Sequence, residues 1–216
     1  MKKGKVKHRF SFAVLSAFCL CAGFKRIVVI GAAVSFGLTF LLGLLPEKIR
    51  IRILNILKYV FIIGLIAYIA VVKFGIFNAL VELWNIDTKG RTGLNDFIDS
   101  YYTFSPLFVG YGLGYIARLF ESVTSLGGAV AVHNDYLRLF IEAGFWGYLV
   151  WLWCFWGYRT SYFTKNRNKQ VYLVFFSLSL YCAITYLTDN TCFYLYTNIS
   201  FFTLILSCSS DEIENE

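Results

Sequence analysis

Residues 27–45 read IVVIGAAVSFGLTFLLGLL and contain no charged side chain. A helix needs about 20 mostly apolar residues to cross a bilayer, with a range of about 17–25. The stretch therefore predicts a membrane-spanning helix, and Pro46 marks its end. An open sheet cannot satisfy its backbone polar groups in lipid, so a helix is the expected conformation.

Further apolar runs occupy residues 10–24, 59–76, 145–158, 171–187 and 192–207. Charged residues make up only 15% of the chain, whereas soluble domains have about 25%. We predict an all-α integral membrane protein with about six transmembrane helices and one large outward-facing loop. The basic residues 1–9 followed by an apolar run resemble a signal peptide, but the next run begins almost at once, so we expect a retained first helix.

Basic clusters at 1–9, 48–58 and 159–169 are separated by pairs of predicted spans, so all three can lie in the cytoplasm. This gives three transmembrane helices in 1–76, an extracytoplasmic loop in 77–144, and three more helices with an acidic cytoplasmic tail in 145–216. Both termini are then cytoplasmic. Lys25 and Arg26 fall on the outer side; local sequence favours a small topological exception over a cationic site. We interpret the net charge of +7 as a topology signal and expect no nucleic-acid partner.

The six cysteines lie within or beside apolar runs and show no metal-ligand spacing, so we expect packed side chains and no metal site. In the loop, residues 93–102 predict a short amphipathic helix that ends before Pro106. Residues 110–115 read GYGLGY, and alternating glycines allow close backbone approach. The pattern is not the dinucleotide fingerprint, while a phosphate-binding nest stays open.

Residues 133–144 read HNDYLRLFIEAG and lead into the run at 145–158. If this stretch is helical, His133 shares an apolar face with Leu137, Phe140 and Ile141. A lone histidine there more often packs in the core, but imidazole also transfers protons near neutral pH. Arg91, between two nearby glycines, is either an exposed loop arginine or a guanidinium fork for a pyrophosphate.

Three features together resemble the O-antigen polymerase and O-antigen ligase family of bacterial surface polysaccharide enzymes. They are Arg91 in a G-R-x-G-like setting, the stretch PLFVGYGLG at 106–114, and the H-N-x-x-L-x-x-x-x-E-x-G stretch from His133, with an apolar span directly after it. The match covers about residues 25–158 well and corresponds to the C-terminal half of a family member.

The resemblance implies a metal-independent glycosyltransferase with no cofactor in the bacterial cytoplasmic (inner) membrane. As a polymerase, it would transfer a glycan from undecaprenyl pyrophosphate to a sugar hydroxyl at the outer face. His133 matches the essential histidine of the family, and Arg91 and Arg26 match its outward arginines, so the resemblance reverses the local interpretation of Arg26. The substrate-binding residues would be Lys25, Asn134, Tyr111 and Gly112.

The implied partners are the lipid-linked glycan, membrane lipid, a flippase or chain-length regulator, and a missing N-terminal half. This last expectation follows because family members have more spans than this chain. The alternatives are an O-antigen ligase that transfers glycan to a lipid A core, an inactive or split fragment, and a non-enzymatic membrane transport subunit. A transporter would carry polar groups near the bilayer midplane, and the predicted spans contain few: Ser35, Thr39, Ser177, Ser179 and Asn198.

Overall fold

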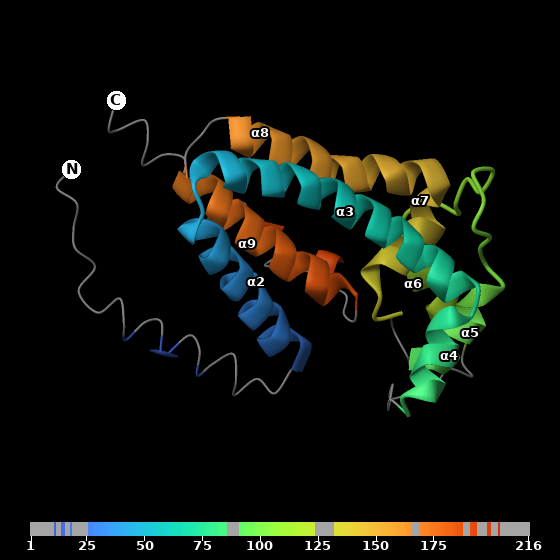
Figure 1. The fold of residues 1–216 in the computed structure, drawn as a ribbon. Coiled ribbons are helices and arrows are strands. Elements are labelled where there is room, and N and C mark those ends of the chain that lie inside the picture. Colours follow the sequence, from blue (N-terminus) through green and yellow to red (C-terminus); the bar gives the residue numbers. More distant parts are fainter. Residues whose placement is uncertain are drawn as a thin grey trace.

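The computed structural model describes residues 11, 14, 15, 18, 26–85, 91–123, 132–165, 169–187, 191–193, 198, 199 and 203. Within these ranges the chain is helical with connecting turns and contains no β-strand, as the all-α prediction requires. The elements are α2 (Arg26–Leu44), α3 (Glu47–Lys73), α4 (Ile76–Leu83), α5 (Arg91–Asp99), α6 (Tyr115–Ser122), α7 (Asp135–Leu152), the π-helical turn η2 (Trp153–Tyr158), α8 (Arg159–Lys165), α9 (Lys169–Tyr186) and the short 3-10 turn η3 (Thr191–Phe193) (Figure 1).

Three helical stretches are long and apolar enough to cross a membrane: Arg26–Leu44, Glu47–Lys73 and Asp135–Tyr162. They correspond to the runs predicted at 27–45, 59–76 and 145–158, and Val171–Tyr186 is a shorter apolar helix in the fifth run. The runs at 10–24 and 192–207 lie outside the described residues apart from isolated positions. Large apolar side chains such as Phe36, Phe40 and Ile63 are exposed on these helices, which indicates surfaces that face lipid.

The core lies where α3, α7 and α9 meet. Tyr148 on α7 donates a hydrogen bond from its hydroxyl to the Leu65 carbonyl on α3, at 3.2 Å. Tyr136, also on α7, donates to the Ala183 carbonyl on α9, at 3.1 Å. Both tyrosine rings are fully buried, and each hydroxyl has the partner that a buried tyrosine needs. On the other side of α9, α2 runs alongside it in the opposite direction (Figure 1).

The basic stretch at 48–58 differs from the expected connection between spans, because it forms the first turns of α3. Pro46 directly precedes the helix, and Glu47 places a negative charge in its first turn, which favours helix formation there. Arg50 lies over the Tyr172 ring at 5.3 Å, and Lys58 donates to Ser161 at 2.9 Å. These long side chains find partners while their stems pack, so a basic sequence does not end the helix.

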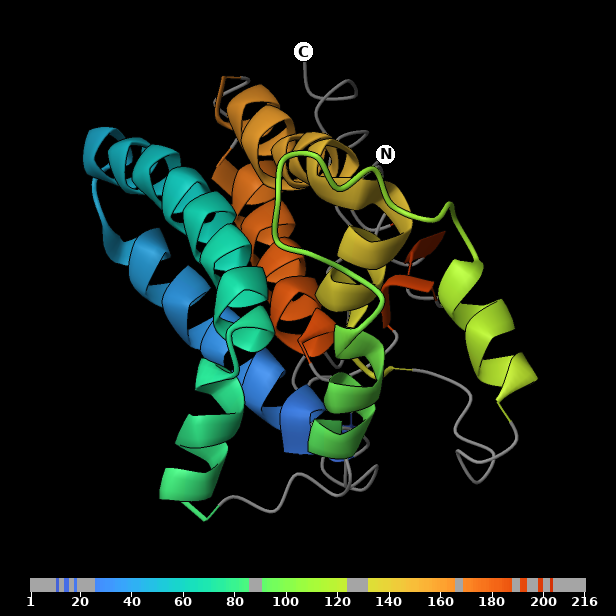
Figure 2. The same cartoon turned by 90° about the vertical axis from the view of Figure 1, so that its right-hand side faces the viewer.

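Residues 77–144, predicted as one loop with one short helix, contain α4, α5, α6 and the start of α7. The amphipathic helix predicted at 93–102 is present as α5 (Arg91–Asp99), which begins two residues earlier and ends three residues earlier. Gly75, at φ 70°, separates α3 from α4. Both views place α4, α5 and the beginning of α2 at one end of the molecule (Figures 1 and 2). The turn between α2 and α3 and the α8–α9 region lie at the opposite end.

Candidate functional site

Two glycines bring the GYGLGY segment onto α7. Gly144 interrupts α7 with φ 73° and ψ 179°, a kink that only glycine adopts readily. Gly110 also has a positive φ, of 82°. A β-carbon on Gly144 would lie 2.2 Å from the Val109 carbonyl oxygen, and one on Gly110 would lie 2.4 Å from the Gly144 nitrogen. The backbones therefore touch directly, which confirms the close approach expected from the alternating glycines.

Backbone hydrogen bonds fix this contact on both sides of the kink. The Tyr111 and Gly112 N–H groups donate to the carbonyls of Ile141 and Glu142 at 3.1 and 2.9 Å. The Phe145 N–H donates to the Phe108 carbonyl at 2.8 Å. The two stretches that carry the family resemblance, at 106–114 and 133–144, thus form one structural unit.

His133 stands just before α7 and is not part of it. Its φ is +52°, in the left-handed region, and its side chain is exposed. The prediction that His133 shares a helical face with Leu137, Phe140 and Ile141 is therefore wrong. Those three side chains are buried, whereas the histidine precedes the first helical turn. The left-handed backbone conformation of His133 turns its side chain away from the buried face that these three residues form.

Asn134 sets the start of the helix at Asp135. It is the N-cap of α7, and its side-chain oxygen accepts a hydrogen bond from the Leu137 N–H at 3.1 Å. Its side-chain amide donates to the Tyr68 hydroxyl on α3 at 2.7 Å. The residue is only 4% exposed. Asn134, predicted to bind substrate, has both polar ends in structural contacts, and these hold the backbone that carries His133.

Further along α7, a partly exposed Arg138 pairs with the buried Glu142, a pair that the sequence analysis did not select. Glu142 accepts hydrogen bonds from the Arg138 Nε at 3.2 Å and from the Ile116 N–H at 3.1 Å, where α6 begins. Glu142 is 2% exposed. The i, i+4 spacing of Arg138 and Glu142 is visible in the sequence and could have found the pair. The contact with Ile116 ties α6 to the same turn of α7 that holds the glycine segment.

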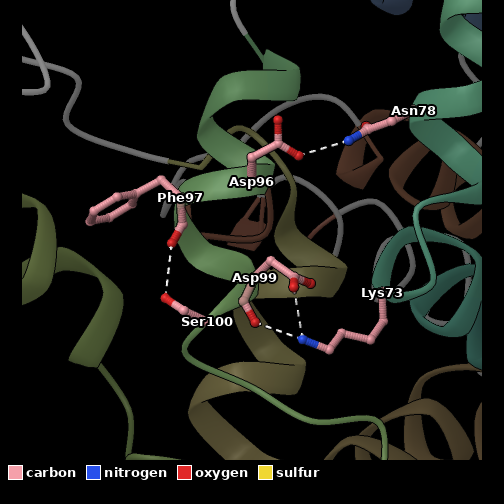
Figure 3. A network of polar contacts seen from close by, with 6 residues as sticks. All are labelled: Lys73, Asn78, Asp96, Phe97, Asp99 and Ser100. Carbon is pink, nitrogen blue, oxygen red and sulfur yellow. Dashed lines mark hydrogen bonds and ion pairs between the residues drawn. The ribbon is translucent and has the colours of Figure 1, made fainter.

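A polar network holds α5 against the end of α3 (Figure 3). Lys73 donates to the Asp99 carbonyl at 2.7 Å and to its carboxylate at 3.0 Å. Asn78 donates to the Asp96 carboxylate at 2.7 Å. Lys73 also lies 4.7 Å above the Tyr102 ring. Burial raises the pKa of the Tyr102 hydroxyl above its ordinary value, and nearby Asp99 and Tyr68 raise it further.

The structure places the remaining predicted site residues as follows. Arg91 is the first residue of α5, and its side chain lies outside the described atoms. Arg26 is the exposed first residue of α2, while Lys25 lies outside the described residues. Tyr111 is about half exposed and stacks on Tyr115, with ring centroids 4.4 Å apart. Figures 1 and 2 place the beginning of α2 and helix α5 at the same end of the molecule.

Replacing Asn134 by alanine is expected to lower the stability by about 0.5–2 kcal/mol, because the Leu137 N–H loses its capping acceptor. Asn134→Asp keeps a capping oxygen but loses the donor to Tyr68, so its effect should be smaller. Thermal unfolding midpoints in one detergent and at one scan rate would measure both. An alanine variant as stable as the parent would show that the cap contributes nothing.

The Lys73–Asp99 ion pair is expected to contribute only about 0.2–1 kcal/mol, because an ion pair open to solvent is screened. Its side chains are 20% and 46% exposed. A double-mutant cycle with Lys73→Met and Asp99→Asn measures this coupling as a difference in unfolding free energy. Lys73→Met combined with Glu82→Gln, an exposed position on α4, is the matched cycle and should show no coupling. Equal coupling energies in the two cycles would contradict an ion pair between Lys73 and Asp99.

Among the residues that the structure describes, no group of three His, Cys, Asp or Glu side chains gathers as metal ligands would. The candidate site comprises the exposed His133 directly before α7, the glycine segment docked further along α7, and the stacked rings of Tyr111 and Tyr115. Comparison with known proteins finds no matching family model, no matching curated protein and no matching solved structure.

Proposed function

We propose that the chain is a polymerase of bacterial surface polysaccharide, such as O-antigen, capsule or exopolysaccharide. It transfers a glycan from undecaprenyl pyrophosphate to a sugar hydroxyl at the outer face of the cytoplasmic membrane. One observation carries the proposal: the two stretches that resemble the polymerase and ligase family dock on each other through Gly110 and Gly144. Their junction lies on the helix whose start presents His133 to the surroundings.

The proposal includes about six spans, cytoplasmic termini and an outward face formed by α4, α5 and α6. The gathering of α4 and α5 with the beginning of α2 at one end supports this topology (Figures 1 and 2). In this proposed topology, Arg26 and Arg91 face the same side of the membrane as His133. The basic first turns of α3 lie at the opposite end, which suits a cytoplasmic side.

In the proposed reaction, His133 acts as general base and takes the proton of the acceptor hydroxyl. The acceptor oxygen forms a bond to the anomeric carbon of the donor sugar. The bond between that carbon and the pyrophosphate oxygen breaks, and undecaprenyl pyrophosphate leaves with the electron pair. Arg91 and Arg26 stabilise the negative charge that develops on this leaving group, with help from Lys25. Guanidinium groups suit this role because they bind phosphate oxygens in a fork.

The stacked rings of Tyr111 and Tyr115 support a place for the glycan. Tyr101 extends the group, with its ring centroid 6.5 Å from that of Tyr115. Aromatic faces of this kind bind the apolar faces of sugar rings. The amide of Gly112 is hydrogen-bonded to α7, so in the proposal this glycine holds the loop in place beside the donor.

The test is polymer length in a strain that lacks its own polymerase and makes the matching repeat unit. Expression of the chain is expected to produce a ladder of lipid-linked glycans, while the His133→Ala variant leaves single units. His8→Ala, the chain's other histidine, serves as the matched control and should retain the ladder. Transfer of single units to a lipid A core would identify a ligase instead. Single units with the unaltered chain, correctly inserted, would contradict polymerase activity.

A further inference from the structure

We propose that the segment at 107–113 inserts into the outer surface of the bilayer, with Leu107, Val109 and Leu113 in contact with lipid hydrocarbon. These three side chains are 88%, 85% and 73% exposed. They lie in a part of the chain that the sequence predicts to face water. The inference concerns where this segment lies and does not depend on the proposed reaction.

The segment has one packed face and one exposed face. Phe108 points inward and stacks on Phe140, with ring centroids 5.5 Å apart. Gly110 lies against the α7 backbone. Leu107 and Val109, on either side of Phe108, face away from the helices. The backbone hydrogen bonds from Tyr111 and Gly112 to α7 keep the segment in this orientation. The segment therefore cannot turn over to hide its apolar side chains without losing its contacts with the helix.

A non-helical segment can enter a membrane only where its backbone polar groups have partners in the protein. Here the Phe108 carbonyl accepts a hydrogen bond from the Phe145 N–H. The Phe108 N–H donates a hydrogen bond to the Ser105 carbonyl at 3.0 Å. The Tyr111 and Gly112 N–H groups donate to α7. The docking on α7 thus lowers the cost of placing this backbone in an apolar medium.

The exposed strip continues the surface that faces lipid on α7. The Val109 carbonyl lies against Gly144, and the exposed side chains of Trp146 and Val150 follow on the same helix. Tryptophan is typical of the boundary between lipid and water. Elsewhere, α4 also ends with large exposed apolar side chains, Leu83 and, directly after the helix, Trp84. Bilayer lipid is therefore the occupant that fits this strip.

Photo-crosslinking tests this placement without changing the cysteines. The amino acid p-benzoylphenylalanine replaces Val109 or Leu107 in the full chain, which is reconstituted in vesicles of phosphatidylcholine and phosphatidylglycerol. Ile63, exposed on the membrane-spanning α3, is the lipid-facing control, and Ser122, exposed on α6, is the water-facing control. Protein mass after irradiation reports phospholipid adducts.

The expected result is a phospholipid adduct at 107 and 109 in a yield near that at 63 and several-fold above that at 122. Leu113 provides a further position, so a misfolded variant at 109 leaves the comparison intact. Adducts no more frequent than at 122 would overturn the proposal. A crosslinked dimer in place of lipid adducts would also overturn it, because a second copy would then cover the strip.

Discussion

Replacing His133 by alanine is expected to lower the rate of the proposed glycan transfer by about 10²–10⁴-fold, the usual contribution of general acid–base catalysis. The imidazole is exposed at the start of α7, and its backbone is held by the cap that Asn134 forms. The histidine is not part of the buried apolar face of α7, so the variant should fold and bind its donor as before. The measurement is the initial rate of chain extension by purified protein in vesicles that contain the lipid-linked repeat unit.

The design separates catalysis from binding and from folding. The alanine variant should change kcat and leave KM for the donor near its original value, because a base that acts on the acceptor hydroxyl contributes little to donor binding. Its thermal unfolding midpoint should match that of the parent chain. His8→Ala controls for the general loss of a histidine. A His133→Ala variant with the full rate would exclude this residue as the base.

Replacing Gly144 by alanine is expected to cause the largest loss of stability. The φ of 73° and ψ of 179° strain any residue with a β-carbon, at a cost of about 1–3 kcal/mol. The new β-carbon would meet the Val109 carbonyl oxygen at 2.2 Å, and overpacking adds about 1–3 kcal/mol. Relief of the clash would push the segment at 108–112 off α7. Thermal unfolding in detergent measures the loss.

Two further glycine variants make this prediction specific. Gly64→Ala on α3 is the matched control, since its β-carbon would meet nothing within 4 Å, and its stability should stay equal or rise slightly. Gly110→Ala should behave like Gly144→Ala, because its β-carbon would lie 2.4 Å from the Gly144 nitrogen. Equal midpoints for the variants at 144 and 64 would show that the two backbones do not touch in the membrane.

The apolar pattern predicted helices well where no charge interrupts them. The run at 27–45 differs from α2 (Arg26–Leu44) by one residue at each end, since nothing in that stretch competes with a lipid-facing helix. The start of α3 could not be predicted in the same way. Arg50 and Lys58 are charged, but both are buried against neighbouring side chains. Those partners, Tyr172 and Ser161, are far away in the sequence.

In the candidate site, the close backbone contact of the glycines could be predicted from the sequence. The contacts between residues far apart in the sequence could not. Alternating glycines imply close backbone contact wherever they dock, and the structure supplies the partner at Gly144. The error at His133 arose because the helical periodicity was extended two residues too far toward the N-terminus, whereas Asn134 caps the helix and His133 precedes it. No sequence rule links Lys73 to Asp99, which pair only because α5 folds back onto the end of α3.

The most direct test of the proposed reaction is the release of undecaprenyl pyrophosphate by the purified chain. Vesicles would contain the chain and a lipid-linked repeat unit, and both products would be measured together. The proposal predicts one undecaprenyl pyrophosphate released for each new glycosidic bond, with release lost in His133→Ala and kept in His8→Ala. Glycan of unchanged length and no released lipid from the folded chain would contradict it, as would equal release by the His133 variant.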